Sequence, residues 1–339
     1  MESCIYEQLA LGRPGENFPD LPTRGNFKTP GGRDSEPRNE LLSGSKEPKD
    51  MPEKPPIVLT IAGFDPSSGA GITADIKTIA AHGCYGISCI TALTVQSTSG
   101  VKKVCGLDPG LIIETLEELE SDVEIAAVHI GMLGSAKVAK AVADFLSSVE
   151  PGRARPGKAR LPNVVLDPIL KSSSGTALLD PGGIRTVVER LIPMVDVVTP
   201  NAAEAGVITG LKVREIEEMN AAAARFHEMG AAAVVVTGGD LDKAIDLLSY
   251  RTKQGIEQEV FKAERQRSNS THGTGCAFAT AMACHLALDR GLAEATLLAK
   301  TYVTAAIANG QDLGRGTGPV HHLYRMGQQR RAIGSGSES

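Results

Sequence analysis

Short β-branched runs alternate with amphipathic helical stretches from residue 56 onwards, and this alternation restricts the fold more than any other feature of the chain. The β-branched runs are apolar along their whole length, as expected for strands that are buried on both faces of a sheet. Ser, Thr, Asn, Asp or Pro often precedes the helical stretches, as is typical of helix starts. The pattern predicts an α/β fold with three layers, in which helices cover both faces of a mainly parallel sheet.

The lengths and periods of these runs define the predicted elements. Strands are expected at residues 57–61, 125–130, 164–166, 195–198 and 233–236. Helices are expected at residues 71–82, 109–120, 135–148, 181–192, 201–209, 214–229, 275–288 and 292–309. An antiparallel pair at one edge of the sheet is expected from residues 244–250 and 258–263.

Residues 1–55 differ from the rest of the chain in composition. They are crowded with Gly, Pro, Ser and mixed charges and have little apolar periodicity, so we expect a disordered N-terminal extension. Met51 stands just before the first strand, and either it is the native start or the extension is a genuine flexible tail. The folded domain is expected to span residues 56–323, followed by a flexible C-terminal tail at 324–339.

The composition argues against several classes of protein. The net charge of −5 and the absence of a dense Lys/Arg cluster with interleaved aromatic residues argue against a nucleic-acid-binding protein. No apolar run is long enough to span a membrane, and the N-terminus lacks the pattern of a secretory signal. The six cysteines include no C-x-x-C pair, which favours reduced thiols in the cytoplasm over a disulfide framework or a zinc site.

Segments that are polar or contain glycine follow most of the predicted strands. In open α/β sheets ligands bind beyond the carboxyl ends of the strands, so these segments are expected to meet at one site. The segments are residues 63–71, 131–133, 167–175, 199–201, 237–239 and 273–276.

The segment 271–283 combines a glycine-rich turn with the start of an alanine-rich helix. Backbone N–H groups and the positive end of the helix dipole would point at one spot there, which suits a phosphate. The same field would stabilise the thiolate of Cys276 and lower the pKa of its thiol. The alternative is that Cys276 is a buried structural cysteine.

Six short blocks of sequence occur in order along the chain: residues 60–75, 91–98, 130–133, 199–204, 272–276 and 318–322. The first contains Gly-Phe-Asp-Pro-Ser-Ser-Gly-Ala-Gly and the fifth is His-Gly-Thr-Gly-Cys. Together the blocks resemble those of hydroxymethylpyrimidine/phosphomethylpyrimidine kinases, a branch of the ribokinase-like superfamily, over about residues 57–323.

The resemblance implies a ribokinase-like domain and a kinase of thiamine biosynthesis. Such an enzyme phosphorylates 4-amino-5-hydroxymethyl-2-methylpyrimidine, and then its monophosphate, at the expense of ATP with Mg²⁺. The resemblance also implies a homodimer. Its implied partners are therefore a small pyrimidine, ATP and a second copy of the chain, without nucleic acid or membrane.

The resemblance also assigns residues to the substrate and to the reaction. The residues that would line the pyrimidine pocket are Gly63, Asp75, Gln96, Met132 and Ile169. Cys276 would be the base or proton relay beside the hydroxymethyl group, and the N–H groups of Gly273, Thr274, Gly275 and Cys276 would stabilise the γ-phosphoryl group. The residues alone leave open a turn-capping role for Gln96, a solvent-facing Asp75 and a core position for Met132.

Phosphoryl transfer needs charge neutralisation and positioning, which other residues are expected to supply. Asn201 and Glu204 could face Mg²⁺ from a helix start, and Asp167 could help to hold the hydrated ion. Asn201 could equally be a plain helix N-cap and Glu204 an exposed helix charge. Nucleotide contacts are expected from Asn201, Thr237 and Gly239.

Thr237 stands where the family commonly has a lysine, and a hydroxyl supplies no positive charge. Two alternative functions remain open, and this departure motivates the second of them. One is a pyridoxal-type kinase, which phosphorylates a hydroxymethyl group on a six-membered ring. The other is a non-catalytic protein that binds or senses pyrimidines.

Overall fold

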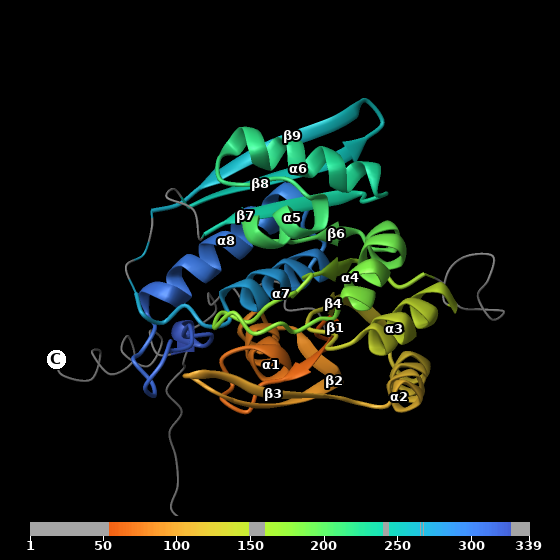
Figure 1. The fold of residues 1–339 in the computed structure, drawn as a ribbon, viewed down its shortest axis with the longest axis vertical. Coiled ribbons are helices and arrows are strands. Elements are labelled where there is room, and N and C mark those ends of the chain that lie inside the picture. The colour runs from red at the N-terminus through yellow and green to blue at the C-terminus, as the bar shows by residue number, and fades with distance from the viewer. Residues whose placement is uncertain (1–53, 149–159, 240–243, 265, 267, 327–339) are drawn as a thin grey trace, which may run out of the picture. The chain divides into compact units, whose positions relative to one another are not determined.

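A nine-stranded sheet with the strand order β3-β2-β1-β4-β5-β6-β7-β8-β9 organises the computed structural model, which describes residues 54–148, 160–239, 244–264, 266 and 268–326. The strands from β2 to β7 in this order pair in parallel, and antiparallel hairpins form both edges (Figure 1). In chain order the strands are β1 Ile57–Phe64, β2 Tyr85–Ser97, β3 Gly100–Gly106, β4 Ile125–Ile130, β5 Val164–Leu166, β6 Val197–Val198, β7 Ala233–Gly238, β8 Ile245–Thr252 and β9 Gly255–Lys262.

Helices cover both faces of this sheet. One face packs against α2 (Pro109–Asp122), α3 (Ala136–Ser148), α4 (Pro181–Thr186), α5 (Ala202–Thr209) and α6 (Ile216–Glu228). The other packs against α1 (Gly71–Ala81), α7 (Thr274–Ala287) and α8 (Leu292–Ala308). The predicted three-layer α/β/α architecture is therefore confirmed.

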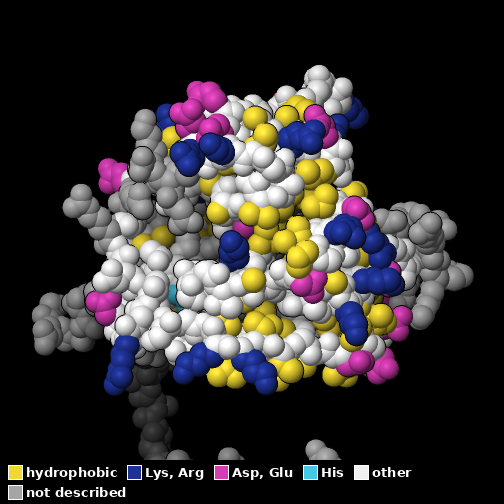
Figure 2. Space-filling view, viewed as in Figure 1, with side chains coloured by type: hydrophobic (Ala, Val, Ile, Leu, Met, Phe, Trp, Pro, Cys, Tyr) yellow, Lys and Arg dark blue, Asp and Glu magenta, His cyan; other side chains and the backbone are white. Residues whose placement is uncertain are grey.

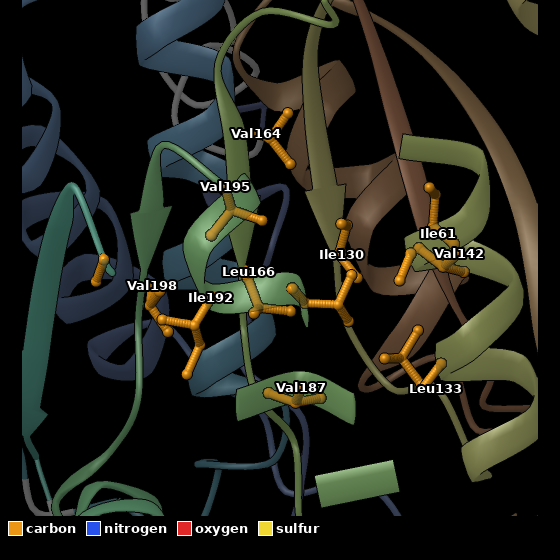
Figure 3. Close-up of a cluster of buried hydrophobic side chains, with 14 of the residues drawn as sticks. Ile61, Ile130, Leu133, Val142, Val164, Leu166, Val187, Ile192, Val195 and Val198 are labelled. Carbon is orange, nitrogen blue, oxygen red and sulfur yellow. The ribbon is translucent and has the colours of Figure 1, made fainter. Parts of the chain in front are cut away.

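Each face of the sheet has its own apolar core. Figure 3 shows part of the first core, in which Ile130 and Leu166 come from neighbouring strands and Val142 comes from α3. Burying a side chain of this size stabilises the fold by about 1.5–3 kcal/mol. The two cores pack on opposite faces of the sheet and hold its strands in place. They thereby position the loops at the carboxyl ends of the strands.

The structure differs from the prediction in two places. The stretch 181–192 is not one helix but α4, a π-helical turn at Val187–Leu191 and a 3₁₀ turn at Ile192–Met194. Pro193 has no N–H group and its ring clashes with an α-helical carbonyl, so a regular α-helix cannot continue there. The other difference is that β2 and β3 are absent from the predicted set. Polar and apolar residues mix in β2, and only its part up to Leu93 pairs in parallel with β1.

The chain divides by its contacts between Asp50 and Met51. The predicted disordered extension at 1–55 and the question of Met51 lie almost wholly outside the described residues. At the other end, Tyr324 falls in the predicted tail but is buried in the second core beside Tyr302, with ring centroids 5.8 Å apart. In the part of the chain that the structure describes, no helix is long and apolar enough to cross a membrane.

Candidate active site

Loops that lie far apart in the sequence are joined by direct contacts at the carboxyl edge of the sheet. Asp65, after β1, lies 2.8 Å from His272, just before α7. The backbone N–H of Leu170, after β5, donates to Glu204 on α5 across 3.4 Å. Asn201, after β6, forms a parallel bridge with β7. The sequence-predicted segments therefore meet at one site.

Helix α7 begins at this site from a glycine that no other residue could replace without rearrangement. Gly273, its N-cap, has a φ of 83°, and a Cβ there would lie 1.8 Å from the carbonyl oxygen of Gly69. This close approach packs the loop after β1 against the start of α7. The first N–H groups of a helix have no intrahelical acceptor, so the start of α7 presents donors and a positive dipole end to the site.

Cys276 lies in the first turn of α7, and its thiol is buried, with 8% of the residue exposed. Burial raises the pKa of this thiol well above its ordinary value, and the charges of Asp167 and Asp75 raise it further. A hydrogen bond from Gly71 acts in the opposite direction but is outweighed. The prediction that the helix terminus lowers the pKa of Cys276 is therefore wrong for the protein without ligands, because burial and nearby carboxylates dominate.

Asp167 and Glu204 form a buried acidic pair next to α7. Burial and the charge of Glu204 raise the pKa of Asp167 well above its ordinary value. Glu204 belongs to a capping box, in which its carboxylate accepts the N–H of Asn201 at 3.0 Å and the Asn201 side chain accepts the N–H of Glu204 at 2.9 Å. Asn201 is thus the helix N-cap, and Glu204 is not an exposed charge.

These two carboxylates fit a hydrated divalent cation. Burial and then repulsion from Glu204 raise the pKa of Asp167, and a bound cation would relieve this repulsion. Among the described residues, no group of three or more His, Cys, Asp or Glu side chains is placed to hold a metal ion directly. Mg²⁺ commonly uses one or two carboxylates and completes its shell with water and substrate phosphates, which matches this pair.

Three of the residues predicted for the pyrimidine pocket lie together. Met132 and Ile169 belong to one small apolar cluster with Ala92. A Cβ at Gly63 would approach the Met132 sulfur to 3.0 Å, so the bare backbone of Gly63 lies against that side chain. The grouping forms a compact apolar wall at the edge of the sheet.

Gln96, near the end of β2, lies at a small cavity of about 130 Å³. The cavity is also lined by residues of the β2–β3 turn, by Ser173 and by His272. The Gln96 amide contacts Thr94, whose hydroxyl lies 3.2 Å from Oε1, and His272, whose Nε2 lies 3.3 Å from the amide nitrogen. The amide therefore stands in a polar niche and not in open solvent.

Asp75 has contacts that differ from the predicted ones. Its carboxylate is fully buried and accepts hydroxyl hydrogen bonds from Thr60 at 2.7 Å and from Thr280 at 2.9 Å. His129 Nδ1 lies 3.3 Å from the same carboxylate. The structure thus places Asp75 in a polar network that ties β1, β4 and α1 to the second turn of α7, and neither of the predicted surroundings, pocket wall or solvent, describes it.

Asp65 and His272 form a polar pair that sequence reasoning did not single out. The Asp65 side chain is 4% exposed and that of His272 is 11% exposed. The bare backbone of Gly69 makes room for the imidazole, since a Cβ there would lie 2.2 Å from the ring. An acidic residue directly after a strand, at the edge where ligands bind, was the available clue.

The strand end at Thr237 lies beside the cap of α5. The Thr237 N–H donates to the carbonyl of Pro200 at 2.9 Å, and Gly239 is exposed. On the neighbouring strand β8, Asp246 forms an ion pair with Lys300 of α8 at 2.7 Å. The charge of Lys300 is thus already compensated within the protein.

A family model described as phosphomethylpyrimidine kinase matches residues 65–321. The chain belongs to this family. It is 39% identical over 269 residues to the hydroxymethylpyrimidine/phosphomethylpyrimidine kinase of Salmonella typhimurium, which covers 78% of this chain and 97% of that protein.

Solved structures of the phosphomethylpyrimidine kinase family and of pyridoxal kinases share its fold. The Clostridium difficile phosphomethylpyrimidine kinase has a TM-score of 0.64 at 35% identity and covers 74% of this chain and 99% of its own. An ADP complex of Bacillus subtilis pyridoxal kinase has a TM-score of 0.70 at 31% identity and covers 80% of this chain and 100% of its own. The ribokinase-like fold is therefore shown by similarity to both kinds of kinase.

Proposed function

We propose that this chain is a hydroxymethylpyrimidine/phosphomethylpyrimidine kinase of thiamine biosynthesis. It transfers the γ-phosphoryl group of ATP to the hydroxymethyl oxygen of 4-amino-5-hydroxymethyl-2-methylpyrimidine, and then transfers a second phosphoryl group to the monophosphate. The observation that carries the proposal is the meeting of three features: the start of α7, the Asp167–Glu204 pair and the niche of Gln96. Membership of the family supports the same activity.

The proposed roles follow the chemistry of phosphoryl transfer. The N–H groups from Gly273 to Cys276 stabilise the charge on the transferred group. In the first step the hydroxymethyl oxygen bonds to the γ-phosphorus, the bond to ADP breaks, and the hydroxyl proton passes to the sulfur of Cys276 in its thiolate form, whose own proton has been lost to solvent. Asn201, Thr237 and Gly239 contact the nucleotide from the adjoining strand ends.

Asp167 and Glu204 are the residues that would hold the hydrated Mg²⁺. When bound, this ion supplies positive charge to the phosphates and offsets the carboxylate charges that keep the Cys276 thiol protonated. The two carboxylates therefore link cation binding to the proton acceptor. The wall formed by Gly63, Met132 and Ile169 supports the ring of the pyrimidine.

A pyridoxal-type kinase is the second candidate, favoured by the B. subtilis pyridoxal kinase as a structural neighbour. A product-resolved assay separates the candidates. The purified chain is incubated with ATP and Mg²⁺ and either the pyrimidine alcohol or pyridoxal, and ADP and each phosphorylated product are quantified. We expect pyrimidine monophosphate followed by diphosphate. Turnover of pyridoxal far above that of the pyrimidine would overturn the proposal, and binding without ADP release would identify a sensor.

We also propose that the chain acts as a homodimer in the cytoplasm. The resemblance to the family supports the dimer, and free thiols in the described region, such as buried Cys89 and exposed Cys105, suit a reducing compartment. Figure 2 shows Lys and Arg side chains and hydrophobic side chains side by side along the edge where β3 lies. Leu93 and Val95 of β2 are 45% and 55% exposed. A second copy of the chain would cover this hairpin.

A further inference from the structure

We propose that His272, held by Asp65, fixes the orientation of the Gln96 amide and thereby the direction in which the pyrimidine binds. The inference rests on the proposed function. It concerns two residues that lie 207 positions apart in the sequence and that the reaction itself does not consume. His272 is in this view a positioning residue, which acts on the substrate through Gln96.

The first step in the argument is the proton on His272. When it is ionised, Asp65 can only accept hydrogen bonds. Burial alone would raise the pKa of Asp65, but hydrogen bonds from His272 and Ser67 outweigh it and hold the pKa below its ordinary value. Three donors of the loop, the N–H and hydroxyl groups of Ser67 and the N–H of Ala70, bond to this carboxylate at 2.7–3.0 Å. The His272 Nε2 atom, 2.8 Å away, must therefore carry a hydrogen.

The second step concerns the amide that faces this N–H group. The amide nitrogen of Gln96 lies 3.3 Å from Nε2, so two donors face one another in that arrangement. Half a turn of the amide exchanges its nitrogen and oxygen with little change in shape. The oxygen then faces the Nε2–H group, whose single hydrogen is shared between Asp65 at 2.8 Å and Gln96 at 3.3 Å. The nitrogen then donates to the Thr94 hydroxyl, which is free to accept because it donates to the carbonyl of Phe64 at 3.0 Å.

The surroundings of the imidazole agree with this tautomer. Ser173 Oγ lies 3.5 Å from Nδ1, on the side where a neutral ring with a hydrogen on Nε2 accepts. The hydrogen-bond directions are then fixed, because Ser173 donates to Nδ1 and the Nε2–H group points to Asp65 and to the Gln96 oxygen. The amide therefore has one preferred orientation.

The third step connects this orientation to the substrate. On the aminopyrimidine ring the hydroxymethyl group and a ring nitrogen flank the amino group on opposite sides. The amide oxygen accepts from the amino group and the amide nitrogen donates to the ring nitrogen. With the oxygen on the side of His272, the hydroxymethyl group is directed toward the residues that follow His272 in the chain, which are Gly273 to Cys276 at the start of α7. The reversed amide would direct it away from them.

The test compares two variants at one position. His272→Gln keeps a side-chain N–H donor for Asp65 and the Gln96 oxygen, whereas His272→Phe keeps the ring volume without a donor. Each protein is assayed with the pyrimidine alcohol and with its analogue that lacks the amino group, in the presence of ATP and Mg²⁺. Thermal unfolding checks that each variant is folded.

We expect His272→Phe to lower kcat/KM for the pyrimidine alcohol about tenfold, which corresponds to about 1.4 kcal/mol, and to change kcat/KM for the analogue less than about threefold. His272→Gln is expected to stay within about threefold of the wild type on both substrates. Equal losses on both substrates, no loss on either, or failure of His272→Gln to retain activity would overturn the inference. If His272→Phe does not fold, Asp65→Asn takes its place. We then expect the same loss of about tenfold on the pyrimidine alcohol and of less than about threefold on the analogue, while His272→Gln stays close to the wild type. A wild-type chain that fails to phosphorylate the pyrimidine would instead count against the proposed function.

Discussion

Cys276 shows how strongly surroundings decide the behaviour of a single residue. Its place at a helix start predicts a stabilised thiolate, yet burial and two carboxylates raise the pKa of its thiol. The sequence could predict the thiol at a glycine-rich helix start, because glycines and a helix start are local features. It could not predict the balance of burial and charge, since Asp167 and Asp75 approach only in the folded chain.

We expect Cys276→Ala to lower kcat of the first phosphorylation at least about tenfold, with the affinity for the pyrimidine largely unchanged. The second phosphorylation should lose less, because its acceptor is a phosphate oxygen that needs no base to remove a hydroxyl proton. Quench-flow measurements that resolve monophosphate and diphosphate check both steps. Equal loss in both steps would argue for a purely structural thiol.

The raised pKa of Cys276 also predicts its reactivity. The thiolate is the reactive form, so a thiol with a raised pKa is alkylated slowly at neutral pH. We expect iodoacetamide at pH 7.5 to modify exposed Cys105 well before Cys276, and Cys276 to react faster only as the pH is raised. Peptide mass spectrometry measures each site, and preferential labelling of Cys276 at pH 7.5 would contradict this expectation.

At the level of elements, the strands of the central layer and the helices on its two faces follow from sequence periodicity, whereas the exceptions follow from particular residues. Strand β4 and strand β5 begin and end as predicted. Pro193 prevents one regular α-helix over 181–192, and the stretch forms α4, a π-helical turn and a 3₁₀ turn instead. Strand β2 escapes prediction because its second half leaves the parallel sheet and pairs with β3 instead. Pairing of this kind depends on a distant partner and leaves no period of its own.

The start of α7 depends on Gly273. We expect Gly273→Ala to destabilise the fold by at least about 2 kcal/mol and to abolish most of the kinase activity, because the residue has a positive φ and a Cβ would collide with Gly69. Gly291→Ala, at the N-cap of α8, is the matched control, since its φ is −65° and a Cβ there meets no atom within 4 Å. Urea unfolding and the coupled ADP assay compare the two. Similar effects from both substitutions would refute this role of Gly273.

For the whole molecule, the packing of the second core sets the response to acid. Burial lowers the pKa of His285 and of His322 to about 4 each, below the ordinary 6.5. Both side chains are therefore neutral in the folded protein and become protonated more readily when it unfolds. Their contribution to stability is complete above pH 6.5 and is lost as the pH falls from 6.5 toward 4.

We accordingly expect the urea midpoint to fall between pH 7.5 and pH 5, and to fall less in His285→Phe than in the wild type. Phe keeps an aromatic ring beside His82, whose ring centroid is 4.9 Å from that of His285, but it has no proton to gain. Equilibrium unfolding at the two pH values measures both midpoints. The same pH dependence in the variant would show that His285 does not contribute.

The proposed dimer also belongs to the whole molecule. We expect Val95→Asp to shift the chain from dimer to monomer, because a charge on the exposed β2 side would be desolvated by a second copy. Light scattering after size exclusion measures the change, and Val207→Asp on α5, where the side chain is 54% exposed, is the control. A wild-type monomer, or a dimer that survives Val95→Asp, would count against this surface.

The contact between Gly69 and Gly273 has a consequence for how the enzyme is made. One side of the contact leaves the ribosome long before the other, since the Asp65–His272 pair that accompanies it spans 207 residues. At roughly 5–20 residues per second, the first loop waits about 10–40 s for its partner. Helix α7 emerges near the end of synthesis, so a nascent chain that stops short of it lacks the helix start that we propose stabilises the transferred phosphoryl group. We therefore expect truncated products of interrupted translation to have no kinase activity.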